Sequence, residues 1–255
     1  MSVSVRNPPP RAGWALSLCA AAGEGGGSFV SSKPPKPRGF VGGPAADPAR
    51  ARAEAGRRAR GRLRRYCAAN RLTRLGTLTY AGEGVHDQRE VRQHVGVFFR
   101  NLRDSLGGEP MPYVWVPEWH KNHGLHLHFG VGQFIPRGKI AAAWGRGHVH
   151  IKLKSARLPA GAGSLAQARA NAGYLSKYVS KTFEAEDDPA KERPRGLHRF
   201  DVAQGFTPKT TRIWATSRAE LIEFASGAMG GAPERMWFSA DEEEWEGPPS
   251  LWLQW

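Results

Sequence analysis

The sequence predicts an α+β domain built on a ferredoxin-like antiparallel sheet with helices on one face. Segments of strand length, rich in β-branched and aromatic residues, alternate with amphipathic helical segments between residues 75 and 153. Their order is strand, helix, strand, strand, helix, strand, which is the split βαβ order of that fold. The uncovered face of such a sheet would be a platform for single-stranded nucleic acid.

The expected elements follow one another at short intervals. They are a strand at 75–80, a helix at 87–106, two strands within 113–131, a helix at 136–144 and a strand at 148–153. Asp87 is a suitable N-cap for the first helix, because its side chain can accept from a free backbone N–H. Gly107 and Gly108 end that helix.

The expected hairpin carries a candidate metal site. His126 and His128 are separated by one apolar residue, so both project from the same face of their strand. If the loop has three residues and is closed by Gly124, Glu118 lies opposite His126 on that face, unless Pro117 shifts the register. Two imidazoles and a carboxylate on rigid backbone favour a divalent cation acting as a Lewis acid over a closed zinc site.

Three other interpretations of the histidines are open at this point. Two histidines on a half-exposed strand need no metal. A zinc site could use the four histidines of the hairpin, which are His120, His123, His126 and His128. A second pair, His148 and His150, could instead be the metal pair, although it lacks a neighbouring carboxylate and a glycine-closed turn.

A helix expected at 164–184 carries candidate nucleophiles. Tyr174 and Tyr178 lie one turn apart, and Lys177 and Lys181 each follow a tyrosine by three residues, which places an ammonium beside each phenol. An amphipathic helix with half-buried tyrosines would show the same pattern. A phenol attacks a phosphodiester at neutral pH only when a metal polarises the phosphate and a nearby group helps it lose its proton.

The composition of the 255-residue chain favours a polyanionic partner. The net charge is +14 and the pI about 10.4, so nucleic acid is a better candidate than a membrane surface. No apolar run approaches the ~18 residues of a membrane span. Cys19 and Cys67 lack metal-ligand spacing, which argues for the reducing cytoplasm. No GxxxxGK[ST] motif is present, so no small-molecule cofactor is expected and unwinding would need another protein.

A basic helix is expected before the first strand. Ten arginines and a single acidic residue lie between residues 50 and 74, and Leu63, Tyr66 and Cys67 form an apolar stripe. We expect the basic face to contact nucleic-acid phosphates, although a solvated basic face would have the same sequence. The candidate contacts are Arg57, Arg60, Arg64 and Arg65.

The chain divides into three expected regions. Residues 1–48 are rich in Pro, Gly, Ser and Ala and would form a disordered tail. Within that tail, residues 11–22 loosely resemble a secretion signal with a short apolar core. The domain that carries the site would span 49–185. Residues 186–255 would be an extension whose tryptophans and acidic residues either dock a partner or pack onto the basic helix.

These segments resemble the HUH endonucleases, and within them the two-tyrosine rolling-circle replication initiators of plasmids and small single-stranded DNA phages. The stretch Thr77-Leu-Thr-Tyr80 resembles the first motif of that family. Glu118 with His126-Leu-His128 resembles its metal motif, and Tyr174-Leu-Ser-Lys-Tyr-Val-Ser-Lys181 resembles its tyrosine motif. The resemblance covers about residues 60–185.

The resemblance implies a bacterial, cytoplasmic enzyme in which His126, His128 and Glu118 hold Mg²⁺ or Mn²⁺. One tyrosine would attack the origin strand, leaving a 5′-phosphotyrosine and a free 3′-OH, and the other would later accept the strand and close the circle. The expected partners are single-stranded DNA at a replication origin and the host helicase and polymerase. The alternatives are a transposase or relaxase with the same chemistry, and a non-catalytic nucleic-acid-binding module.

Overall fold

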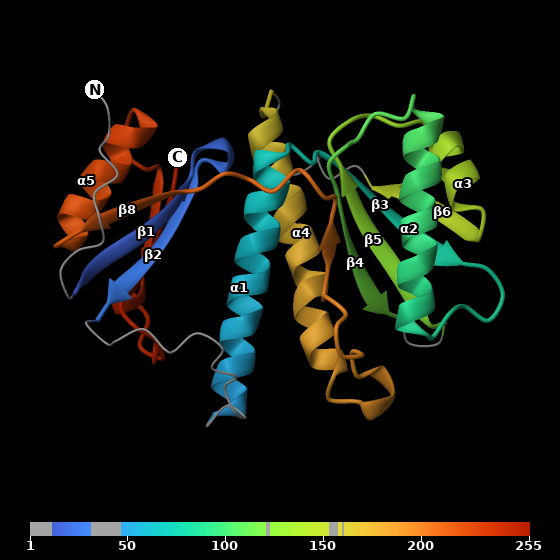
Figure 1. Ribbon diagram of the computed structural model, residues 1–255, viewed down its shortest axis with the longest axis horizontal. Helices are drawn as coiled ribbons and strands as arrows, with labels where there is room; N and C mark the ends of the chain where they lie inside the picture. Colours follow the sequence, from blue (N-terminus) through green and yellow to red (C-terminus); the bar gives the residue numbers. More distant parts are fainter. Residues whose placement is uncertain (1–11, 32–46, 121–122, 153–157, 160) are drawn as a thin grey trace. The chain divides into compact units, whose positions relative to one another are not determined.

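The computed structural model describes residues 12–31, 47–120, 123–152, 158–159 and 161–255 (Figure 1). It divides into a central unit, residues 46–207, and a terminal unit that combines residues 1–45 with 208–255. Each unit contains a five-stranded antiparallel sheet accompanied by helices. The mixed α+β class is therefore confirmed.

The sheet of the central unit has the strand order β6-β3-β5-β4-β7. Its strands are β3 (Arg74–Tyr80), β4 (Tyr113–Trp119), β5 (Leu125–Val131), β6 (Gly147–Lys152) and β7 (Asp201–Val202). Its helices are α1 (Pro48–Ala69), α2 (Gln88–Ser105), α3 (Arg137–Trp144), α4 (Ser164–Ala185) and the short 3₁₀ helix η3 (Pro189–Lys191). The first four strands and the two helices between them have the predicted ferredoxin-like order.

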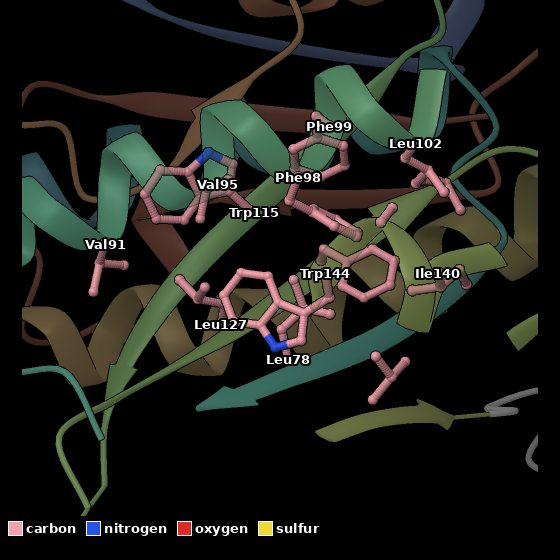
Figure 2. Close-up of a cluster of buried hydrophobic side chains, with 14 of the residues drawn as sticks. Leu78, Val91, Val95, Phe98, Phe99, Leu102, Trp115, Leu127, Ile140 and Trp144 are labelled. Carbon is pink, nitrogen blue, oxygen red and sulfur yellow. The ribbon is translucent and has the colours of Figure 1, made fainter. Parts of the chain in front are cut away.

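Helices α2 and α3 cover one face of this sheet. Figure 2 shows Val95, Phe98 and Leu102 of α2 above Leu127 of β5, with Trp144 of α3 beside them. These side chains are almost fully buried, and each contributes roughly 1.5–3 kcal/mol of hydrophobic stabilisation. The stripe predicted for the helix at 87–106 is therefore the stripe that packs on the sheet.

Helices α4 and α1 cover part of the other face, which corrects the expectation of helices on one face only. Leu75 and Val114 of the sheet pack against Leu175 and Val179 of α4, and Leu63 of α1 belongs to the same cluster. In Figure 1, α4 lies between α1 and the strands. The cause is local, because alternate residues of β3 and β4 on this face are apolar and need a cover. The face is not an open platform.

The β4–β5 hairpin has the predicted register. Glu118 pairs with His126, and the ladder continues through Pro117, which pairs with Leu127 without a shift. Gly124 closes the turn with a φ of 64°, and a Cβ there would collide with the backbone oxygen of Val85. Residues 121 and 122 of the turn lie outside the described residues.

The terminal unit is a second sheet with the order β8-β1-β2-β10-β9. Its strands are β1 (Gly13–Cys19), β2 (Glu24–Val30), β8 (Thr211–Ala215), β9 (Arg235–Phe238) and β10 (Ser250–Gln254). The helix α5 (Arg218–Met229) packs on one face, where Leu16, Ile213 and Leu221 share an apolar cluster. Short 3₁₀ helices, η1 (Ala20–Ala22) and η4 (Ser239–Asp241), follow β1 and β9.

Two expected boundaries are therefore wrong. Residues 13–30, assigned to a disordered tail and in part to a possible secretion signal, form the hairpin β1–β2. The glycines of β2 are there for close packing, since a Cβ on Gly27 would collide with the backbone of Ala15. The extension expected at 186–255 is also divided, because β7 joins the central sheet while Trp237 and Trp252 pair within the terminal sheet. Among the described residues, no helix has the length and apolar character required to cross a membrane.

Candidate active site

The site lies on the face of the central sheet that α4 covers. Residues directly opposite in an antiparallel ladder point to the same side. His128 of β5 is opposite Thr77 of β3, which in turn is opposite His150 of β6. Glu118 and His126 form the next pair along the hairpin. The register therefore gathers the predicted metal ligands and the first-motif threonine on one face.

Glu118 and His128 are in direct contact. The Nε2 atom of His128 lies 2.6 Å from Oε2 of Glu118, and its Nδ1 atom shares a hydrogen bond of 3.0 Å with the hydroxyl of Thr77. His128 is only 6% exposed, so the ring is held from both sides within the sheet. Lys181 of α4 donates to the other carboxylate oxygen of Glu118 at 2.5 Å.

This arrangement keeps Glu118 ionised. Burial opposes the charged form, but hydrogen bonds from His128 and Lys181 outweigh it and hold the pKa of the Glu118 carboxyl below its usual value. An ionised carboxylate beside an imidazole nitrogen is a pair of donors that a hard divalent cation accepts. The same contact also stands as an ordinary ion pair without any metal.

His126 lies with the other histidines of the hairpin. Its ring stacks on that of His120 with centroids 4.6 Å apart and meets His123 edge-on at 6.0 Å. Its Nε2 atom is buried and has no hydrogen-bond partner. Burial and the neighbouring imidazoles lower the pKa of His126, which favours the neutral ring that a metal requires.

The structure does not gather the hairpin histidines around one point. His128 is engaged with Glu118, whereas His120, His123 and His126 form a separate group. In the described part of the chain, no three His, Cys, Asp or Glu side chains are arranged as a ready metal centre. His148 and His150 are exposed on β6, and the residues opposite them are Thr79 and Thr77 instead of a carboxylate.

The two tyrosines of α4 face this site. Their hydroxyls share a short hydrogen bond, and the ring of Tyr178 stacks on His128 with centroids 3.5 Å apart and planes 16° from parallel. Leu175 and Val179, adjacent to the tyrosines in sequence, are buried against the sheet and fix the rotation of the helix. Two segments more than 40 residues apart in sequence therefore meet at one place.

Only one of the two predicted lysines is at the site. Lys181 contacts Glu118, and its ammonium lies 5.4 Å from the centroid of the Tyr178 ring. Lys177 is exposed, and no hydrogen bond or ion pair joins it to any residue that the structure describes. The expectation that it accompanies Tyr174 is therefore wrong, because the helix turns its side chain toward solvent.

A different lysine accompanies Tyr174. Lys152 of β6 donates to the Tyr174 hydroxyl at 2.8 Å, and its ammonium lies 4.7 Å from the centroid of that ring. The sequence contained a signal for it, because His148, His150 and Lys152 alternate and so share the face that carries His128. That signal is weak without the strand pairing.

The Tyr178 phenol is held in its neutral form. Burial is the largest cause, followed by the hydrogen bond to Tyr174 and the negative charge of Glu118, and all three raise the pKa of Tyr178 far above its usual value. Tyr178 is therefore a hydrogen-bond donor at neutral pH.

The arginines of α1 lie beside α4. The predicted stripe of Leu63, Tyr66 and Cys67 is buried, as expected. Arg60 donates to the hydroxyl of Ser180 on α4 at 3.3 Å, whereas Arg57 is exposed. Arg64 and Arg65 are half-buried on the same helix. Contact of these four arginines with DNA stays a prediction.

A cavity of about 330 Å³ adjoins the site. Glu118 and Lys181 form part of its wall, together with Trp119 and residues of the segment after α4, among them Arg193 and Arg199. Both arginines are ion-paired with Glu186, so they hold that segment in place. The cavity leaves space for a ligand directly beside the carboxylate.

Comparison with known families bears on this segment. Residues 73–183 match the model of the replication-associated protein ORF2 family. The match begins at β3 and ends within α4, so it contains Glu118, His128, Lys152 and both tyrosines and leaves out α1 and the terminal unit. It is consistent with a replication initiator that acts on DNA. The comparisons with curated proteins and with solved structures gave no significant match.

Proposed function

We propose that this protein is a rolling-circle replication initiator that nicks and rejoins single-stranded DNA through a tyrosine. The observation that carries the proposal is the stacking of Tyr178 on His128, with the Tyr174 hydroxyl bonded to that of Tyr178. It brings two candidate nucleophiles to the Glu118–His128 pair on rigid elements. The match to a replication-associated family and the net charge of +14 support DNA as the substrate.

The reaction is an exchange of phosphodiester bonds. The phenol oxygen of a tyrosine forms a bond to phosphorus, and the bond from phosphorus to the 3′ oxygen breaks. The phenol proton passes to water and the 3′ oxygen takes one up, which leaves a 5′-phosphotyrosine and a 3′-OH. Attack by a second tyrosine on a newly made origin, followed by attack of the 3′-OH on the first phosphotyrosine, would release a closed circle.

The residues present fit a divalent cation. Glu118 and His128 direct an oxygen and a nitrogen at one point, and His126 has a buried ring nitrogen without a partner. These three side chains would hold Mg²⁺ or Mn²⁺, which when bound supplies charge neutralisation at the scissile phosphate. Thr77 orients His128 through Nδ1, in the manner that metal-ligating histidines require.

The partners proposed are single-stranded DNA at a replication origin and, because no ATP-binding loop is present in the sequence, a host helicase and a host polymerase. A transposase or relaxase would use the same chemistry on a different DNA. A binding module without catalysis is the alternative from another class, and it requires neither tyrosine.

A denaturing gel tests the proposal. Purified protein is incubated with labelled circular single-stranded DNA of its own replicon, and in parallel with a pool of random single-stranded oligonucleotides, with Mn²⁺ or with chelator. We expect a band that survives boiling in detergent, needs Mn²⁺ and is lost when both Tyr174 and Tyr178 are changed to Phe. Tight binding to both DNAs without any such band would instead establish the binding module.

A further inference from the structure

The two tyrosines have unequal surroundings, although each is followed by a lysine at the same spacing in sequence. The Tyr174 oxygen accepts a hydrogen bond of 2.8 Å from the ammonium of Lys152, which comes from a different element, β6. The Tyr178 oxygen contacts the Tyr174 hydroxyl, and its own ring is stacked on His128.

The lysine next to Tyr178 is committed elsewhere. Lys181 donates to Glu118 at 2.5 Å, and its ammonium meets the face of the Tyr178 ring, not its oxygen. Of the two phenol oxygens, only that of Tyr174 accepts from an ammonium of the described residues. A cation at hydrogen-bond distance stabilises the negative charge on a phenol oxygen as its proton leaves, and it also fixes the direction of that oxygen.

We infer that Tyr174 makes the first attack on the DNA strand and that Lys152 is the catalytic residue that activates it. The inference rests on the proposed function and adds to it the order of the two tyrosines. While Tyr174 attacks, its oxygen accepts from Lys152 and from the Tyr178 hydroxyl, so Tyr178 keeps its proton and is silent. The new bond joins Tyr174 Oη to phosphorus, the bond to the 3′ oxygen breaks, and the phenol proton goes to water.

The first attack also explains how Tyr178 enters the second round. Once the Tyr174 oxygen is esterified to phosphorus it is a poor hydrogen-bond acceptor, so the Tyr178 hydroxyl loses its partner. Its ring is still stacked on His128, next to the Glu118 pair. Tyr178 is then free to act on the next copy of the origin, while Tyr174 carries the first strand.

The rate of the first strand transfer tests this order. Single-turnover adduct formation is measured with Mn²⁺ on the protein's own single-stranded replicon and on the random pool, and the modified peptide is identified by mass spectrometry. We expect the adduct on Tyr174 in the wild-type protein and in Tyr178→Phe, and no fast adduct in Tyr174→Phe. Lys152→Met should slow the transfer about 100-fold, as loss of one donor to a developing charge does.

Two comparisons separate chemistry from folding and from DNA binding. Lys152→Arg keeps the cation and should recover at least about ten-fold of the lost rate. Lys209→Met removes an exposed charge of the terminal unit and should leave the rate unchanged. The Kd for DNA in chelator should be similar for all of these variants.

The outcomes distinguish the two proposals. A first adduct on Tyr178, or a Lys152→Met rate equal to that of Lys209→Met, overturns the inference and leaves the strand-transfer function standing. Absence of any adduct in the wild-type protein on both DNAs overturns the proposed function, and the inference with it. An adduct on Tyr174 that depends on Lys152 supports both.

Discussion

Oε2 of Glu118 lies 2.6 Å from Nε2 of His128, although the two residues are diagonal neighbours in the β4–β5 ladder. The residue directly opposite Glu118 is His126, whose ring turns toward His120 instead. The carboxylate therefore selects one of two histidines that the strand presents equally. Contacts between diagonal neighbours are within reach of long side chains on a twisted sheet.

Replacing Glu118 with Gln should make stability less dependent on pH in the acid range. Because the folded-state pKa of Glu118 lies below its unfolded value of about 4.5, its contribution is complete above that pH and is lost as the pH falls further. Urea unfolding without metal should show wild type about 2 kcal/mol more stable than Glu118→Gln at pH 7, with the gap shrinking below pH 4.5. Exposed Glu184→Gln serves as the control and should show no gap.

Changing Thr77 to Val should weaken metal binding without removing a ligand. The hydrogen bond from Thr77 to Nδ1 sets the orientation of the His128 ring, and loss of such support costs about 10- to 100-fold in metal affinity. Titration calorimetry with Mn²⁺ measures it. Thr79→Val on the same strand face is the matched variant, and equal losses in both would contradict the orienting role.

The two His-x-His pairs should respond differently to alanine. His128→Ala removes the partner of Glu118 and the ring under Tyr178, so Mn²⁺-dependent adduct formation should fall at least about 100-fold. His150→Ala, at an exposed position of β6 with no carboxylate opposite, should keep the rate within about three-fold. The reverse pattern on the denaturing gel would assign the metal to β6.

Gly27→Ala should destabilise the terminal unit, because its Cβ would meet the backbone of Ala15 and Leu16 on the neighbouring strand. Overpacking of this kind costs about 1–3 kcal/mol. Gly26→Ala, one position away, has no atom closer than 4.0 Å to its Cβ and should cost less. Thermal unfolding followed by tryptophan fluorescence compares the two, and equal values would argue against the β1–β2 hairpin.

Arg57→Ala should reduce the salt dependence of DNA binding. If Arg57 neutralises one phosphate of a single strand, the slope of log K against log salt should fall by about 0.7. Fluorescence anisotropy with a labelled oligonucleotide over a salt series gives the slope. Arg235→Ala in the terminal unit is the control, and an unchanged slope in Arg57→Ala would remove α1 from the DNA-binding surface.

The sequence by itself determined the elements of the central unit and the composition of its site. A strand repeats its faces every two residues and a helix every 3.6, so the period alone put His126 and His128 on one face and the two tyrosines on another. The glycine after the hairpin turn was enough to pair Glu118 with His126. Each of these inferences depends on residues within a few positions of one another.

Only the tertiary structure decided which side chains meet. Lys152 beside Tyr174, the cover of α1 and α4 on the second sheet face, and the pairing of β1 and β2 with the C-terminal strands all join segments far apart in the chain. Such contacts depend on long-range strand register and on helix rotation, which local periodicity does not specify. The same limit explains the error at Lys177, where equal spacing from a tyrosine led to a different orientation than at Lys181.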